Sequence, residues 1–429
     1  MKIEAAKTDT VRLVLDNAKI TNSTGAAINV VSASEAIIYT AAGTTNTVAD
    51  EANYTATGDD DPDAAIYSTA NLTLAGEGSL SVEGSYEEGI HTTGGLVIAS
   101  GTLEVNAANT GIKGKDYVDI TGGIVNVTAA QDGIKSTNTD DESLGFTRLS
   151  AGSVTVSAGD DGLKAPRTLE ISGGTLNIEK SNEGIEAQYI NILDGEVTVN
   201  STDDGINASL KDSSSDTSSD TTSGTAAAGQ QTQQNQNGQV QQAPAGGGAA
   251  PGGSQGSTGQ NQNMPQPPTD GAMPGGGGGT VTVNAEGDGI DSNGTATFSG
   301  GTVTVNGPVA GGNNALDSNG DLLLNGGIVT AGSTADMFEA PSSASTSGYL
   351  KITDSSALTQ GSTVQVTDSS GTVVANYKIT TSGVQLVLVS NKNIVKGQSY
   401  TVSVTSGSVD AASTTAASGA SELGSFTAA

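Results

Sequence analysis

Apolar and polar residues alternate in short runs along most of the chain, as in 102–105, 153–156 and 302–305. A period of two with many β-branched residues is typical of strands that bury one face. Gly, Asn and Asp separate the runs, and no stretch shows the 3.6-residue period of an amphipathic helix. The pattern therefore predicts an all-β chain of short strands joined by tight turns.

The strands belong to a repeat in which a polar or acidic residue, a Gly, an Ile or Leu, a polar residue and a small residue follow one another. The residues at the Gly position of its copies, called anchors here, are Ala65, Gly89, Gly111, Gly133, Gly162, Gly184, Gly205, Gly289, Ala315 and Met337. Most anchors are 21 to 26 residues apart, and a second Gly follows nearly every one by 11 or 12 residues. Three short strands in each such unit predict a parallel β-helix, whose coils bury their apolar positions against one another.

The repeat is interrupted once by a long tract of Ser, Gln, Asn, Gly and Pro, and it resumes in register afterwards. We therefore expect residues 1–212 to form the N-terminal part of the β-helix, 213–279 a disordered insertion, and 280–340 its continuation. Residues 341–429 lose the repeat but keep strand patterns, which predicts a small β-rich C-terminal element that caps the helix or forms a module.

Equivalent positions of successive coils lie about 5 Å apart in a parallel β-helix, so a column in the sequence becomes a column in space. The position before the anchor is mostly acidic, and stacked carboxylates repel unless they share a cation; hard oxygen ligands of this kind suit calcium. Alternatively, each Asp only serves a turn in which the following Gly supplies a positive φ. The candidate calcium ligands are Asp132, Asp160, Asp161, Glu183, Asp203, Asp204, Asp288, Asp291 and Asp317.

Two positions after the anchor the column contains Lys113, Lys135 and Lys164, and becomes acidic in later coils. These lysines are candidates to bind the carboxylates of an acidic glycan beside the calcium. Alternatively, they only neutralise the acidic residues that precede the anchors, as cross-strand ion pairs. A lysine next to a metal also resembles the base of a β-elimination, the reaction of a polysaccharide lyase.

The amino-acid composition excludes several classes of ligand and partner. The 429 residues include no Cys, which excludes disulfides and Cys-ligated metals, and the formal net charge is −30. Such a charge repels nucleic acid and anionic membranes and attracts cations. There is no apolar run long enough for a membrane span and no signal-peptide core at the start.

Several runs with matching order and spacing resemble a family of bacterial cell-surface proteins described as a carbohydrate-binding domain. These runs are 11–15, 23–28, 63–68, 111–116, 132–138 and 396–402. The resemblance implies a right-handed parallel β-helix like that of pectate lyases, bound calcium, and binding of plant cell-wall polymers such as polygalacturonate and cellulose, with no established catalysis. It also implies secretion, with a signal sequence upstream of this chain.

Together, these features favour a calcium-dependent binder of acidic plant cell-wall polysaccharide, pectin above all and cellulose as a further ligand. We expect a monomer at the cell surface or outside the cell, with no nucleic-acid partner, no membrane insertion and no residue assigned a catalytic role. The alternatives are a polysaccharide lyase and a structural or adhesive β-helical rod.

Overall fold

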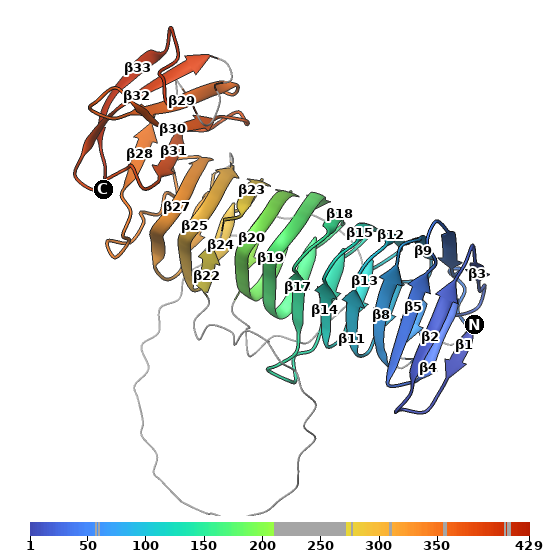
Figure 1. The fold of residues 1–429 in the computed structure, drawn as a ribbon. Coiled ribbons are helices and arrows are strands. Elements are labelled where there is room, and N and C mark those ends of the chain that lie inside the picture. Colours follow the sequence, from blue (N-terminus) through green and yellow to red (C-terminus); the bar gives the residue numbers. More distant parts are fainter. Residues whose placement is uncertain are drawn as a thin grey trace, which may run out of the picture. The chain divides into compact units, whose positions relative to one another are not determined.

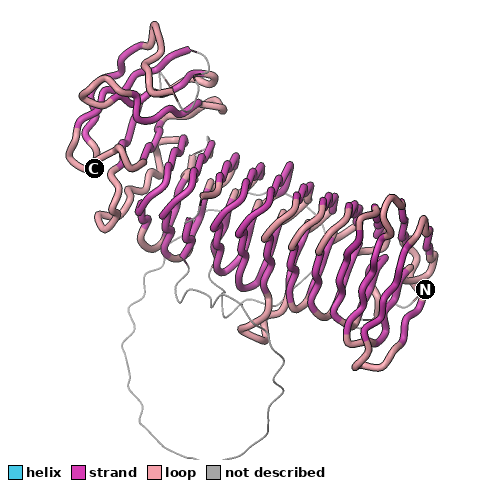
Figure 2. Tube along the Cα trace, in the orientation of Figure 1, coloured by secondary structure: helices cyan, strands magenta, loops and turns pink. Residues whose placement is uncertain are grey.

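A computed structural model of the chain describes residues 1–55, 58, 61–209, 272–275, 278–308, 311–354, 358–406, 409 and 413–429. All regular secondary structure in these ranges is β-strand, as Figure 2 shows, which confirms the predicted all-β fold. Within the same ranges, no helix could span a membrane. The predicted insertion, 213–279, lies outside the described residues except for 272–275, which form strand β22, and 278–279.

The strands stack in parallel as three sheets, and the chain visits the sheets in turn over about 11 turns (Figure 1), which confirms the predicted parallel β-helix. The first sheet contains the anchors. Its strands are β1 (Lys2–Glu4), β4 (Ile28–Ser32), β7 (Ala64–Ser68), β10 (Glu88–Thr92), β13 (Ile112–Gly114), β16 (Ile134–Ser136), the first parts of β19 (Leu163–Ser181) and β20 (Ile185–Ser201), β21 (Ile206–Ala208), β24 (Ile290–Ser292) and β26 (Leu316–Ser318).

The other two sheets follow the same order, and the long strands bend from one sheet into the next. The second sheet has β2 (Thr10–Leu15), β5 (Glu35–Thr40), β8 (Asn71–Gly76), β11 (Gly95–Ile98), β14 (Tyr117–Ile120), β17 (Phe146–Leu149), β22 (Ala272–Gly275) and parts of β19, β20, β25 (Thr295–Asn306) and β27 (Leu322–Ser333). The third has β3 (Lys19–Thr21), β6 (Thr45–Ala49), β9 (Ser79–Gly84), β12 (Thr102–Ala107), β15 (Ile124–Ala129), β18 (Ser153–Ser157), β23 (Thr280–Ala285) and the ends of β19, β20, β25 and β27.

The core consists of apolar columns, because the inward residues of one turn lie in register with those of the next. Ile66, Ile90 and Ile112 pair in this way and have no exposed surface. Each such side chain stabilises the fold by about 1.5–3 kcal/mol relative to an exposed one. The register continues across the long interruption, since Ile206 pairs with Ile290.

The anchor glycines are required by space, not by backbone conformation. Neither Gly89 nor Gly184 has a positive φ, so the expected role of the anchor Gly in supplying that geometry was wrong. A Cβ on Gly184 would lie 2.2 Å from Val199 Cγ1 and 2.2 Å from the carbonyl oxygen of Gly205. The anchor therefore lets the first and third sheets approach closely at the corner of each turn.

Positive φ values occur instead at the second glycine of the unit, where the second sheet passes into the third. The glycines concerned are Gly101, Gly123, Gly152, Gly174, Gly195, Gly301 and Gly327. An L-residue with a side chain rarely adopts this conformation, which explains why Gly recurs there. The last predicted anchor, Met337, lies in a turn and not in a strand, so the first sheet ends at β26.

The C-terminal element closes the last turn. Strand β31 (Leu386–Ser390) pairs antiparallel with the end of β27 and also with β28 (Tyr349–Thr353). The remaining strands, β29 (Ser362–Thr367), β30 (Val373–Lys378), β32 (Ser399–Ser406) and β33 (Ser421–Thr427), form an antiparallel sheet of their own. The antiparallel pairing with β31 covers the edge that the third sheet would otherwise expose.

Candidate functional site

Of the two polar columns predicted from the sequence, the one after the anchors lies on the first sheet, and most residues of the one before the anchors lie in the turns that lead into it. The residues two positions after the anchors pair in register from turn to turn, in the order His91, Lys113, Lys135, Lys164, Glu186, Asn207, Asp291 and Asp317. Their side chains are therefore neighbours of the acidic residues that precede the anchors. The charge of this face changes along the stack, since its lysines all lie in the earlier turns.

In the earlier turns each lysine is held in an ion pair. Lys113 Nζ lies 3.1 Å from Glu88 Oε1 and 3.7 Å from Asp63 Oδ2, and Lys135 Nζ lies 2.6 Å from Asp132 Oδ2. These carboxylates are buried or half-buried, so the ammonium groups neutralise charges that water reaches poorly. In these turns the lysine ammonium groups supply the positive charge that a bound metal ion would otherwise supply.

Lys164 shows the same arrangement with two acids. Its Nζ lies 2.6 Å from Asp161 Oδ2 and also contacts Glu186. Burial alone would lower the pKa of Lys164, but the two carboxylates raise it overall, so the side chain stays an ammonium. Burial raises the pKa of Asp161, although Lys164 opposes the shift.

Two acidic groups form around these lysines, and all their members except Glu186 were predicted as calcium ligands. Asp132, Asp160 and Asp161 bring oxygens within 4.8 Å of one another, and so do Asp161, Glu183 and Glu186. Burial raises the pKa of Glu183 to about 7, with a further contribution from Glu186. A cation could bind at either group only in competition with Lys135 or Lys164.

A third group was not predicted. Asp63 Oδ1 lies 2.5 Å from His91 Nδ1, and both are close to Glu88. Burial lowers the pKa of His91, so the ring is neutral at pH 7. The signal in the sequence was weak, because the anchor that follows Asp63 is the degenerate Ala65, where the acidic pair seen before other anchors is reduced to one residue.

The later turns contain carboxylates without a basic partner. We call the set Asp204, Asp288, Asp291, Asp317 and Glu339 the acidic column. In the part of the chain that the structure describes, no Lys, Arg or His forms an ion pair with it. Asp204, a predicted ligand, belongs to the acidic column. Its neighbour Asp203, also a predicted ligand, is exposed and lies outside the column.

Burial and mutual repulsion raise the pKa values in the acidic column. Burial, then the charges of Asp204 and Asp317, raises the pKa of Asp291 to about 6. Burial raises the pKa of Asp288 to about 6 and that of Glu339 to about 7, although each accepts a backbone N–H. These carboxylates would be stabilised by a positive charge that the described residues do not provide.

The amide of Asn207 adds a neutral oxygen to this surface. Asn207 pairs in register with Asp291, and its Nδ2 donates to Glu183 Oε2 at 3.2 Å. Its Oδ1 is buried and has no hydrogen-bond partner among the described residues. Carboxylate and amide oxygens are the ligand types that calcium takes, but among the described residues no three acids of the column bring oxygens within 4.8 Å of one another.

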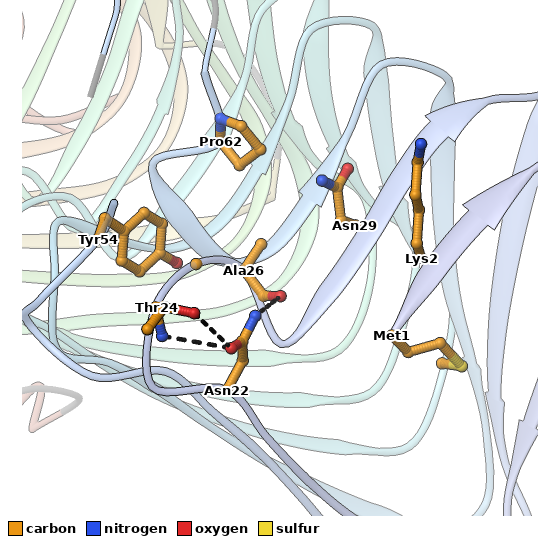
Figure 3. Close-up of a pocket in the computed structure, with 9 residues that line it drawn as sticks. Met1, Lys2, Asn22, Thr24, Ala26, Asn29, Tyr54 and Pro62 are labelled. Carbon is orange, nitrogen blue, oxygen red and sulfur yellow. Dashed lines mark hydrogen bonds between the residues drawn. The ribbon is translucent and has the colours of Figure 1, made fainter. Parts of the chain in front are cut away.

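A cavity at the N-terminal end of the chain does not belong to this site. It has a volume of about 280 Å³ and is lined by residues including Met1, Asn29 and Tyr54 (Figure 3). The amide of Asn22 shapes its wall, since Nδ2 donates to the carbonyl of Ala26 at 2.9 Å and Oδ1 accepts from the backbone N–H of Thr24. Among the described residues that line it, none carries a carboxylate.

Comparison with known proteins agrees with a carbohydrate-binding role. A family model described as "Carbohydrate-binding domain-containing protein" matches residues 1–241, more than half of the chain, and the chain belongs to this family. A relative of the same description from Acetivibrio thermocellus is 37% identical over 97 residues, which are 22% of this chain and 34% of that protein. The matched stretch thus spans about a third of the relative.

A solved structure is also similar in part. It is described as the polysaccharide lyase-like protein from C. thermocellum, in a gadolinium derivative. The match has a TM-score of 0.44 and 31% identity, and it covers 45% of this chain and 81% of that chain.

Proposed function

We propose that this carbohydrate-binding protein holds acidic plant cell-wall polysaccharide, of the polygalacturonate type, through calcium bound at the acidic column. The observation that carries the proposal is the difference between the two halves of the first sheet. Lysines compensate the acids of the earlier turns, whereas Asp288, Asp291 and Glu339 have raised pKa values and no ammonium nearby among the described residues.

Calcium is the cation that suits this surface. It accepts six to eight oxygen ligands in irregular geometry, and it keeps positions for ligands from outside the protein. The carboxylates of an acidic polysaccharide would fill those positions, because a divalent ion removes the repulsion between polymer and protein. Asp204, Asp288, Asp291, Asp317 and the amide oxygen of Asn207 are the ligands that we propose.

The lysine half of the face would extend the same binding surface. Lys113, Lys135 and Lys164 each have three N–H donors, and the ion pairs leave part of each side chain exposed, 22%, 24% and 40% respectively. A polymer that follows the stack would meet lysines at one end and calcium at the other. Repetition at about 4.8 Å per turn lets one long ligand use several weak contacts together.

We propose binding without turnover. A β-elimination needs a neutral lysine or another free base, and Lys164 is kept protonated by Asp161 and Glu186. Because the ligand belongs to plant cell walls, the protein would act outside the bacterial cell, at its surface. Cellulose is a further ligand that accompanies this polymer in the wall.

Calorimetry with polygalacturonate tests the proposal. We expect binding in calcium, loss of binding in excess chelator, and constant ultraviolet absorbance, which would rise if a lyase formed unsaturated ends. The double variant Asp291→Asn/Asp317→Asn should bind at least about tenfold more weakly, because two charged ligands are lost.

The matched control is Asp140→Asn/Glu142→Gln, which removes the same charge from an exposed loop. Equal binding losses in both variants would refute a specific site and indicate general electrostatics. Binding that persists in chelator would refute the role of calcium, and rising absorbance would identify a lyase.

A further inference from the structure

An open groove of about 630 Å³ lies at the end of the third sheet, beside the loop that follows β30. One wall is formed by Asn200, Asn284 and Asn306, and the other by Thr380 and Thr381. The volume is in the range of small-molecule sites. The acidic column begins in the turns that follow the third sheet, and Glu286 of the groove precedes Asp288 by only two residues, but none of the described residues that line the groove belongs to the column.

The three asparagines form a ladder on the outer face of successive turns. Asn200 pairs in register with Asn284, and Asn284 pairs with Asn306. Asn306 Nδ2 donates to Asn284 Oδ1 at 2.9 Å, and Asn284 Nδ2 donates to Asn200 Oδ1 at 2.8 Å. Asn200 Nδ2 in turn donates to the carbonyl of Ile178 at 2.9 Å.

The hydrogen bonds of the ladder do not use all the donors and acceptors of its amides. An Asn side chain has two N–H donors and two acceptor lone pairs, and each of these amides uses one of each within the ladder or at its ends. One N–H and one lone pair of Asn200 and of Asn284 therefore stay available to a ligand, and both residues are partly exposed. They repeat from turn to turn, as alternating donors and acceptors along the stack.

The C-terminal element holds the second wall in place. Tyr377, in β30, is buried, and its hydroxyl lies 3.0 Å from Asn306 Oδ1. This contact ends the ladder and places the start of the following loop, which carries Thr380 and Thr381. The hydroxyls of these two threonines make no hydrogen bond within the described residues, since Gln360 bonds only the backbone carbonyl of Thr380.

The groove is almost uncharged. Among the described residues that line it, only Glu286 is ionisable, and its side chain is exposed, whereas the net charge of the chain is −30. Neutral amides and hydroxyls on two facing walls cannot compensate an ion, but they match the paired hydroxyl groups of a sugar, each of which donates and accepts. A chain of sugar rings laid along the stack would meet successive amides of the ladder.

We propose that this groove binds an uncharged oligosaccharide, held by the Asn200–Asn284 amides on one side and by the hydroxyls of Thr380 and Thr381 on the other, without a metal ion. The site lies beyond the acidic polysaccharide site and does not depend on calcium. It needs both the β-helix and the C-terminal element, so neither part forms it alone.

The test is calorimetry on the full chain in excess chelator, with cellohexaose, xylohexaose and maltohexaose as probes. Chelator removes the calcium-dependent site, and the groove variant given next separates binding in the groove from any binding of cellulose elsewhere on the chain. We expect at least one probe to bind. Thr380→Val/Thr381→Val should weaken that binding about tenfold, because it removes two hydrogen bonds but keeps the shape of the wall.

Two controls make the result specific. Thr128→Val/Thr155→Val makes the same change on the outer face of the third sheet away from the groove, and should leave affinity within about twofold. Glu286→Gln should also leave it unchanged, since the proposed ligand is neutral. No binding of any probe would overturn the proposal, and so would equal losses in the Thr380/Thr381 and Thr128/Thr155 variants.

Discussion

The hydroxyl of Tyr377 lies 3.0 Å from Oδ1 of Asn306, and it also contacts the carbonyl of Val305 at 3.3 Å. A buried side chain of the C-terminal element thereby bonds directly to the outer face of the β-helix. The aromatic ring fits only because residue 332, in the next turn, is a glycine. A Cβ on Gly332 would lie 2.3 Å from the Tyr377 hydroxyl oxygen.

Gly332→Ala is therefore expected to destabilise the chain by about 1–3 kcal/mol, because the added methyl group overpacks a buried contact. Denaturant unfolding followed by circular dichroism measures the change. Gly25→Ala is the control, since a Cβ there meets its nearest described atom at an ordinary 3.6 Å. Equal effects of the two substitutions would contradict the importance of the Tyr377 contact.

Gly89→Ala tests the spatial role of the anchor glycines. A Cβ at this position would lie 2.3 Å from Val105 Cγ1 and 2.8 Å from the carbonyl oxygen of Gly111, so we expect a loss of about 1–3 kcal/mol or more. Adding Val105→Ala should recover part of that loss, although Val105→Ala alone leaves a cavity and destabilises. Purely additive losses in the double variant would show that crowding against Val105 is not the cause.

Lys164→Met should destabilise the chain by about 1–3 kcal/mol near neutral pH, because Asp161 is 2% exposed and, without its ammonium partner, must either hold an uncompensated charge or take up a proton. The substitution retains the aliphatic stem. Since burial already raises the pKa of Asp161, the variant should recover stability as the pH falls and that carboxyl takes up a proton.

Thermal and denaturant unfolding of Lys164→Met at about pH 8 and about pH 5 measures this dependence. Lys180→Met is the matched control, because Lys180 is exposed and forms no ion pair within the described residues. A loss that is the same at both pH values would argue against an uncompensated Asp161.

The acidic column should make the free energy of unfolding depend on pH in the opposite direction from an ion-paired acid. Its carboxyls have raised pKa values, so the folded chain binds protons more tightly than the unfolded chain. The free energy of unfolding contributed by these groups therefore rises as the pH falls through about 7 to about 4, and falls as the pH rises. His91, whose pKa is lowered, contributes in the other direction.

Comparison with Asp291→Asn/Asp317→Asn isolates the column, because His91 is common to both chains. Without calcium, the variant should gain roughly 1–2 kcal/mol relative to the parent at about pH 8, and less at about pH 5, after allowance for partial exposure. Millimolar calcium should stabilise the parent and remove this difference. A variant less stable than the parent at pH 8 in chelator would contradict mutual repulsion in the column.

The sequence by itself determined the repeat, the three sheets and the order of the columns. The reason is that a strand exposes alternate residues on opposite faces, and a fixed repeat length places equivalent residues in register. Lys113, Lys135 and Lys164 could be assigned to one column for this reason, and so could Asp291 and Asp317. The same periodicity located the second glycine of each unit, but the positive φ was expected at the anchors instead, and the periodicity did not show why the anchors are glycine.

Only the tertiary structure decided which charges meet and which surfaces face each other. Ion pairs such as the one between Lys164 and Asp161 depend on how far the side chains extend and how deeply they are buried. The periodicity of the sequence does not specify either property. The contact between Tyr377 and Asn306 joins segments that share no repeat, so no periodicity could predict the groove beside Thr380. Long-range packing of this kind depends on how well two surfaces fit together. In this chain they fit only because residue 332 is a glycine and has no side chain.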